Sequence, residues 1–144
     1  MDKVLIAFDI GTTDATADLG LRVRLDSTVV YENAHITETI NFSHEISDEE
    51  GEHQLEIELF GKRPEHTKID DAGEIVQDAL ITLKNIHLDG IDIEQILQDL
   101  VEYHHDFNGT QLPVVHKFYG SFGCNGQIRL KFTTPVYLWL LENM

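Results

Sequence analysis

Polar and apolar residues alternate through most of this chain, and that pattern limits the folds it can adopt. In residues 127–132, the side chains of Gln, Arg and Lys alternate with those of Ile, Leu and Phe, which is the spacing of a strand with one solvated face. Residues 21–25 and 55–59 show the same alternation, and residues 36–46 extend it over a longer segment. Turns rich in Gly, Asp and Ser separate these segments, one of them at Asp26 and Ser27, and a tight turn is also predicted at residues 70–73. The sequence therefore predicts a mostly β protein, an antiparallel β-sandwich.

A single domain spanning residues 1–144 is expected, because 144 residues with 42% hydrophobic side chains are enough to bury one core. One segment has apolar residues at helical spacing and predicts one short helix, at residues 93–100. Its apolar residues are Ile93, Ile96, Leu97, Leu100 and Val101. Asp92 and Gln95 have the spacing of a capping box at the start of this helix.

The register of apolar residues changes within the segment 79–88. Alternate positions 79, 81 and 83 are apolar, and further along the apolar positions are 86 and 88. Because side chains alternate between the two faces of a strand, this change predicts a bulge, a bend or a switch between sheets near Lys84 and Asn85.

The final segment breaks the alternation, because residues 136–141 form an uninterrupted apolar and aromatic run. As a strand, this run is apolar on both faces and needs cover on both. It is therefore either a central strand of a sheet or a strand completed by a partner protein. In the second alternative, the candidate partner-binding residues are Tyr137, Trp139 and Leu141.

Acidic side chains outnumber basic ones by 26 to 10, which gives a formal net charge of −16. This charge argues against nucleic acid and anionic membrane surfaces as partners. It favours a well-solvated acidic surface, bound cations or a basic partner. Cys124 is the only cysteine, so a fold stapled by disulfides is not expected. The apolar segment at residues 4–8 is too short for a signal peptide or a membrane span, so we expect synthesis in a cytoplasm.

Acidic turns indicate calcium as the one metal to consider. Calcium binds about six to eight oxygen atoms, commonly in loops, and the candidate ligands are Asp70, Asp71, Asp89 and Asp92. The sequence has no EF-hand spacing, and its eight histidines and single cysteine lack the spacing of a zinc site. Apart from calcium, no cofactor is expected.

The sequence has no evident catalytic motif, which predicts a protein that is not an enzyme. Cys124 lies in a Gly-Cys-Asn-Gly turn, without a neighbouring charge to activate its thiol. A hydrolase with two carboxylates stays an alternative, although nothing in the sequence selects the pair.

Aromatic residues gather around glycine-rich loops near the C-terminus. Tyr103, Phe118 and Tyr119 are candidates for stacking against sugar rings or for anchoring a protein interface. In the other interpretation, these rings close the ends of the sandwich.

The segments GEHQLEI (residues 51–57) and LDGI (residues 88–91) are similar to strands of jelly-roll carbohydrate-binding modules. This resemblance implies glycan binding, with or without calcium, in attachment to a host surface.

The segments GEHQLEIELFGKRPEHTKID, LDGIDI, YHHDFNG and KFYGSFGCNGQIRLKFTTPVYLWLLENM resemble small uncharacterised proteins of T4-like tailed phages of marine cyanobacteria. The resemblance implies a virion component, either a capsid decoration protein or a part of the tail, neck or fibre. Its partners would be other virion proteins or further copies of itself in a homo-oligomer. A non-catalytic virion protein is therefore the main prediction, and a carbohydrate-binding module is the alternative.

Overall fold

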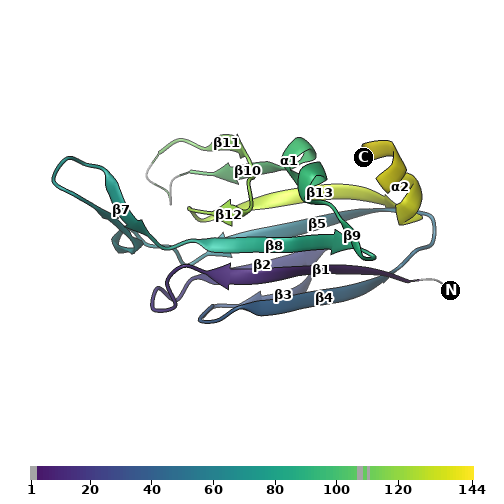
Figure 1. Cartoon of the computed structure of the whole chain (residues 1–144), viewed down its shortest axis with the longest axis horizontal. Helices are drawn as coiled ribbons and strands as arrows, with labels where there is room; N and C mark the ends of the chain where they lie inside the picture. Colours follow the sequence, from purple (N-terminus) through teal and green to yellow (C-terminus); the bar gives the residue numbers. More distant parts are fainter. Residues whose placement is uncertain (1–2, 107–108, 110) are drawn as a thin grey trace.

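The computed structural model describes residues 3–106, 109 and 111–144. Two antiparallel sheets stack face to face and enclose the hydrophobic core (Figure 1). The predicted β-sandwich is confirmed, but two α-helices, rather than one, accompany the sheets in the described part of the chain. No helix among the described residues is long and apolar enough to cross a bilayer.

The first sheet has the strand order β12-β8-β1-β4, with β9 beside β8. Its strands are β1 (Lys3–Thr12), β4 (Ile40–Ser47), β8 (Ile81–Leu88), β9 (Ile91–Asp92) and β12 (Ser121–Phe122). The second sheet has the order β11-β10-β13-β5-β2-β3. Its strands are β2 (Gly20–Leu25), β3 (Thr28–Asn33), β5 (Gly51–Phe60), β10 (Glu102–His105), β11 (Val114–Lys117) and β13 (Gly126–Thr134).

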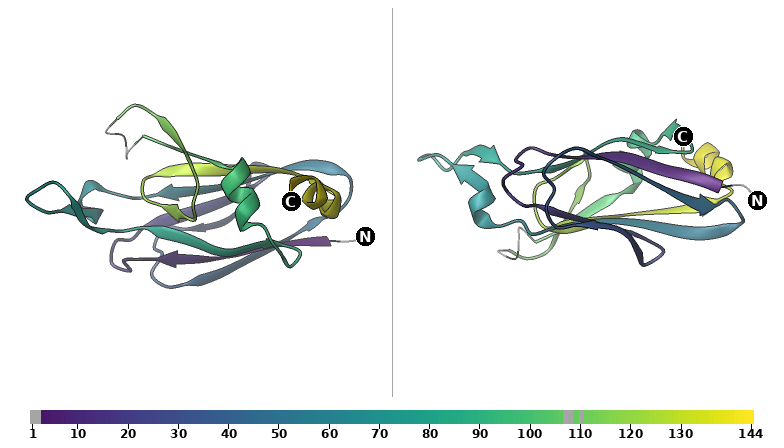
Figure 2. Two further views of the ribbon diagram at one scale, coloured as in Figure 1. Left: turned by 45° about the horizontal axis from the view of Figure 1, so that its top comes forward. Right: turned by 90° about the horizontal axis from the view of Figure 1, so that it is seen from below.

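A small hairpin projects from one end of the sandwich (Figures 1 and 2). It consists of β6 (Thr67–Ile69) and β7 (Ile75–Asp78) and follows the short 3-10 helix η1 (Pro64–His66). We call residues 67–78 the arm. The tight turn predicted at residues 70–73 forms its tip, where Asp70 Oδ1 accepts the N–H groups of Ala72 and Glu74 at 2.9 and 3.0 Å.

Alternation along the strands places apolar side chains from both sheets in the space between them. In β13, Ile128, Leu130 and Phe132 are buried, whereas Arg129 and Lys131 are exposed. Burial of each such apolar side chain contributes about 1.5–3 kcal/mol relative to exposure. The period-2 pattern of the sequence is therefore the pattern of the core.

The β2–β3 hairpin turns at Asp26 and Ser27, as predicted. Both residues have positive φ, 51° and 69°, as in the two-residue turns that match the twist of paired strands. Asp26 also contacts β5, because Oδ1 accepts the Gln54 N–H at 2.9 Å and Oδ2 lies 2.7 Å from Nδ1 of His53. Burial raises the pKa of the Asp26 carboxyl, but the hydrogen bonds from His53 and Gln54 outweigh burial and leave this pKa below its ordinary value.

The predicted change of register near Asn85 is a bulge in β8. Two residues of β8, Asn85 and Ile86, lie opposite Phe8 of β1. Asn85 has a φ of 55°, and its side-chain amide donates to Asp9 Oδ2 at 2.7 Å. The extra residue brings Ile86 to the core, where it is buried.

Helix α1 (Glu94–Leu100) confirms the predicted helix. Its N-cap residue is Ile93, without a side-chain capping hydrogen bond, and the predicted capping box of Asp92 with Gln95 does not form. Oδ1 of Asp92 accepts the Glu94 N–H at 2.8 Å, which satisfies one free donor of the first turn. The Gln95 side chain instead donates to Asp99.

The strand predicted for residues 136–141 is wrong, because this run forms helix α2 (Val136–Asn143). A short apolar run does not by itself distinguish a buried strand from a helix. Here β13 pairs with β5 up to Thr134, which lies opposite Gly51, the first residue of β5, so the chain after Pro135 has no partner strand along β5 and forms hydrogen bonds within itself. The Val136 N–H donates to Asp48 Oδ1 at 2.8 Å, and the acidic β4–β5 turn thereby caps α2.

Candidate functional site

A cleft of about 220 Å³ lies between β8, α1 and the chain that leads into β12. Buried Leu97 and Phe118 supply apolar surface in it. Lys84, Gln98 and Ser121 add hydrogen-bonding side chains to the same lining. The cleft therefore combines an apolar floor with polar groups that could bind hydroxyls.

Tyr119 also lines this cleft and is 71% exposed. Its neighbours in the sequence hold the loop in place. Phe118 is buried, with its ring centroid 4.9 Å from that of Phe122, and the Gly120 carbonyl accepts the Leu83 N–H at 2.7 Å. Gly120 has a φ of 98°, which a residue without Cβ adopts readily. The Tyr119 ring is thus presented from a segment anchored on both sides.

Only one of the three predicted glycan-binding aromatics, Tyr119, is exposed. Tyr103 is buried, and its ring packs edge-on against Phe118 and Phe122, with centroids 6.1 and 5.2 Å apart. Its hydroxyl donates to the carbonyl oxygen of Cys124 and accepts the N–H of the same residue. Burial raises the pKa of this hydroxyl well above its ordinary value. The glycan-binding prediction is therefore wrong for Tyr103, which packs in the core. Phe118 lines the cleft, but its ring is buried in the floor and is not exposed for stacking.

The four predicted calcium ligands lie in two separate parts of the molecule, the tip of the arm and the region of β9. Asp70 and Asp71 are at the tip of the arm, Asp89 accepts the Tyr137 hydroxyl at 2.6 Å, and Asp92 accepts the Glu94 N–H at the start of α1. Within the described residues, no group of three or more His, Cys, Asp or Glu side chains is arranged to hold a metal ion. At Asp70, Asp89 and Asp92, the carboxylates instead fix a turn, a tyrosine and a helix end.

Helix α2 separates the three predicted partner-binding residues. Trp139 is buried, with its ring edge-on to Phe132 and the centroids 6.1 Å apart. Tyr137 and Leu141 are 50% and 77% exposed. The helix places Trp139 on the side opposite Tyr137 and Leu141, whereas a strand would have placed all three on one face. Trp139 therefore belongs to the core, and only the other two can contact a partner.

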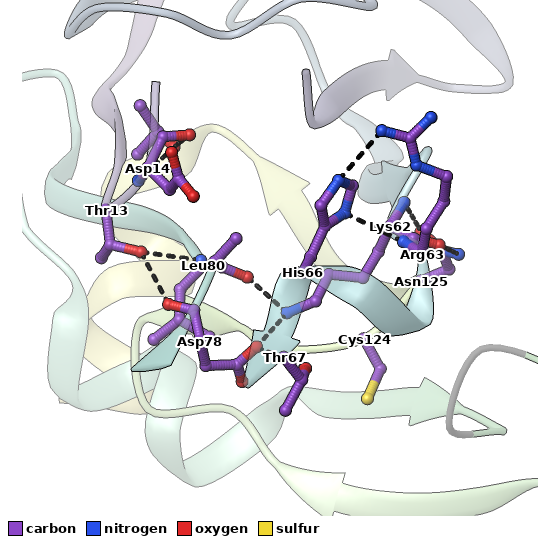
Figure 3. A network of polar contacts seen from close by, with 12 residues as sticks. Thr13, Asp14, Lys62, Arg63, His66, Thr67, Asp78, Leu80, Cys124 and Asn125 are labelled. Carbon is purple, nitrogen blue, oxygen red and sulfur yellow. Dashed lines mark hydrogen bonds and ion pairs between the residues drawn. The ribbon is translucent and has the colours of Figure 1, made fainter. Parts of the chain in front are cut away.

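The side chain of Lys62 is fully buried at the base of the arm (Figure 3). Its Nζ lies 2.5 Å from Asp78 Oδ1 and also donates to the carbonyl oxygen of Ala79. The Thr67 hydroxyl donates to the same oxygen of Asp78 at 2.7 Å. Both strands of the arm are thus tied to each other and to the chain that follows β5.

The same network reaches two further segments (Figure 3). The Lys62 N–H donates to Asn125 Oδ1 at 2.8 Å, and Asn125 Nδ2 donates back to the Lys62 carbonyl at 2.9 Å. The Thr13 hydroxyl donates to the Asp78 carbonyl at 3.1 Å. Sequence reasoning missed Lys62, because it is one of several charged residues in a segment with the composition of a loop.

No family model and no curated protein matches this sequence. Among solved structures, the chain is similar to one described as "vCBM60 in complex with galactobiose", with a TM-score of 0.46 and 11% sequence identity. The similarity covers 89% of this chain and 96% of that one. The resemblance to phage proteins is not tested by these comparisons and stays a prediction.

Proposed function

We propose that this protein is a non-catalytic glycan-binding domain whose sugar site is the cleft at Tyr119. The observation that carries the proposal is the exposed Tyr119 ring beside an apolar floor and several hydrogen-bonding side chains. An aromatic ring offers a flat apolar face for the C–H face of a sugar, and polar side chains around it offer donors and acceptors for the hydroxyls.

The cleft suits one sugar ring of a longer chain. Its volume of about 220 Å³ lies below the range of about 300–1,000 Å³ that is common for small-molecule pockets. Lys84 supplies donors only, whereas Gln98 and Ser121 supply both donors and acceptors. Such a site would read the positions of a few hydroxyls, and the rest of the glycan would stay in solvent.

A glycan array followed by titration calorimetry with the best binder tests this proposal. Tyr119→Ala should weaken binding about tenfold, because the stacking surface is removed. Tyr137→Ala is the matched control, because Tyr137 is another exposed tyrosine that lies outside the cleft, and it should leave the affinity unchanged. No sugar bound on the array, or equal losses in both variants, would contradict the proposal. The titrations are run with calcium and with a chelator, which tests the calcium dependence directly.

The arm supports a second candidate function, a component of a tailed-phage particle that assembles through protein contacts. Ile69 and Ile75 form a cross-strand pair, and they and Val76 are 61–63% exposed. An isolated two-stranded hairpin is marginally stable in water, yet this one is fastened at its base by Lys62. Exposed apolar side chains on a fastened projection favour cover by another protein.

Mass spectrometry and immunogold labelling of purified particles test this second function. Absence of the protein from the particles would contradict it. Where the protein is present, the double variant Ile69→Ser/Ile75→Ser should reduce its incorporation about tenfold. The control is Val29→Ser, which changes an exposed apolar residue of β3. This variant should be incorporated normally. Equal incorporation of both variants would remove the arm as the docking element.

A further inference from the structure

Helix α2 carries an exposed apolar strip that its core-facing side does not explain. Val136, Trp139 and Leu140 are buried. The strip consists of Tyr137, Leu138, Leu141 and Met144, which are 50–77% exposed. These positions are spaced by three and four residues, apart from the adjacent first pair, so they form one continuous surface along the outer side of the helix.

Carboxylates flank this strip on one side. Leu138 and Pro135 line a hollow of about 650 Å³ together with Glu50, Glu52 and Glu142. All three glutamates are exposed, and within the described part of the chain none of them has an ion-pair partner. The hollow therefore presents apolar surface and three uncompensated negative charges to the same ligand.

The opposite side of the strip is also acidic. Tyr137 donates its hydroxyl to Asp89 Oδ2 at 2.6 Å, which brings a fourth carboxylate to the helix from the β8–β9 connection. A ligand that covers the apolar strip thus meets negative charge along both of its edges. Acidic groups in this position attract cationic side chains and repel anionic ones.

We propose that the α2 strip is a docking site for a basic protein segment that carries apolar anchors. The partner's apolar side chains would cover Leu138 and Leu141, and its Lys or Arg side chains would pair with the flanking glutamates. A second copy of this chain fits less well, because a symmetric contact across α2 would bring the same carboxylates face to face in a protein of net charge −16. The site is separate from the sugar cleft, because the two share no lining residue.

Binding of a designed amphipathic peptide of leucine and lysine, measured by fluorescence anisotropy, tests the proposal. A peptide with glutamate in place of each lysine is the matched probe. The protein should bind the lysine peptide and not the glutamate peptide, and the affinity should fall as salt is added. Failure to bind the lysine peptide, or equal binding of both, would overturn the proposal.

Paired variants locate the site. Leu141→Ser should weaken binding of the lysine peptide about tenfold, because the bound peptide would bury Leu141 and the variant loses this apolar contact. Leu112→Ser removes a leucine that is 84% exposed elsewhere and should have no effect. Glu52→Gln with Glu142→Gln should weaken binding and reduce its salt dependence, whereas Glu74→Gln on the arm should not. If the strip and control variants behave alike, the peptide binds elsewhere.

Sedimentation of the free protein tests whether the strip instead binds a second copy of this chain. A dimer that forms in the wild type and is lost in Leu141→Ser would assign the strip to a second copy and overturn the proposal.

Discussion

The amine of Lys62 lies 2.5 Å from the Oδ1 atom of Asp78, and the lysine side chain is fully buried while that of Asp78 is 23% exposed. This pair closes the base of the arm. The arm has no hydrophobic core of its own, since the apolar residues Ile69, Ile75 and Val76 are exposed. Its attachment to the sandwich therefore depends on polar contacts with limited access to water.

Loss of Asp78 should destabilise the protein more than loss of Lys62. Asp78→Ala leaves a buried ammonium with its charge unpaired, which costs about 3–5 kcal/mol. Lys62→Met removes the buried charge and leaves a carboxylate that water can reach, so a smaller loss is expected. Urea unfolding of both variants measures the difference. A larger loss for Lys62→Met would show that the buried charge is not the dominant cost.

Asp26→Asn should lower stability in a pH-dependent way. The folded-state pKa of Asp26 lies below its ordinary value of 3.8, so folding favours the ionised form. This stabilisation is complete above the unfolded-state pKa and is lost as the pH falls through the lower folded-state pKa. We expect a difference from wild type of about 0.5–1 kcal/mol at neutral pH, because the carboxyl is half exposed.

Urea unfolding at several pH values measures this difference, which should shrink below pH 3.8. Asparagine also tolerates the positive φ at this position, so the backbone is not a competing cause. Asp71→Asn is the control, because it removes the same charge from the exposed tip of the arm and should change stability by less than about 0.5 kcal/mol. A difference for Asp26→Asn that persists unchanged at pH 2 would contradict the linkage.

Trp139→Ala should cost about 3–5 kcal/mol, because it leaves a cavity beside Phe132. Leu141→Ala on the same helix should cost less than about 0.5 kcal/mol, since the leucine is exposed. Thermal unfolding followed by circular dichroism separates the two. Similar melting temperatures for the two variants would mean that α2 does not pack on the core through Trp139.

Gly126→Ala should destabilise the pairing of β10 with β13. A Cβ at this position would overlap the carbonyl oxygen of His104 and lie 2.8 Å from His105 Cβ, and backbone atoms cannot rotate away. We expect a loss of about 1–3 kcal/mol from overpacking. At Gly73, φ is 83° and no atom lies within 4 Å of an added Cβ, so Gly73→Ala should cost about 1 kcal/mol through backbone strain alone. Chemical unfolding measures both, and a loss for Gly126→Ala well below about 1 kcal/mol would argue against the close contact at Gly126.

Local patterns in the sequence predicted the elements whose structure depends on neighbours along the chain. Period-2 alternation gave the strands of the sandwich, and the change of register gave the bulge at Asn85. The turn at Asp26 and Ser27 and helix α1 also follow from patterns within a few consecutive residues. These features depend on side-chain direction and backbone preference, which a few consecutive residues define.

Tertiary structure decided the features that depend on distant parts of the chain. The apolar run after Pro135 is a helix because its partner strand β5 begins opposite Thr134, so the run has no strand to pair with along β5. Lys62 is buried because Asp78 and Ala79 meet its amine, and Tyr119 is exposed while Tyr103 is not because only Tyr103 packs under other rings. Charge, size and aromatic character are properties of a residue, whereas burial and pairing are properties of its surroundings. The sequence alone therefore determined the sandwich, and the tertiary structure decided which residues form the candidate site.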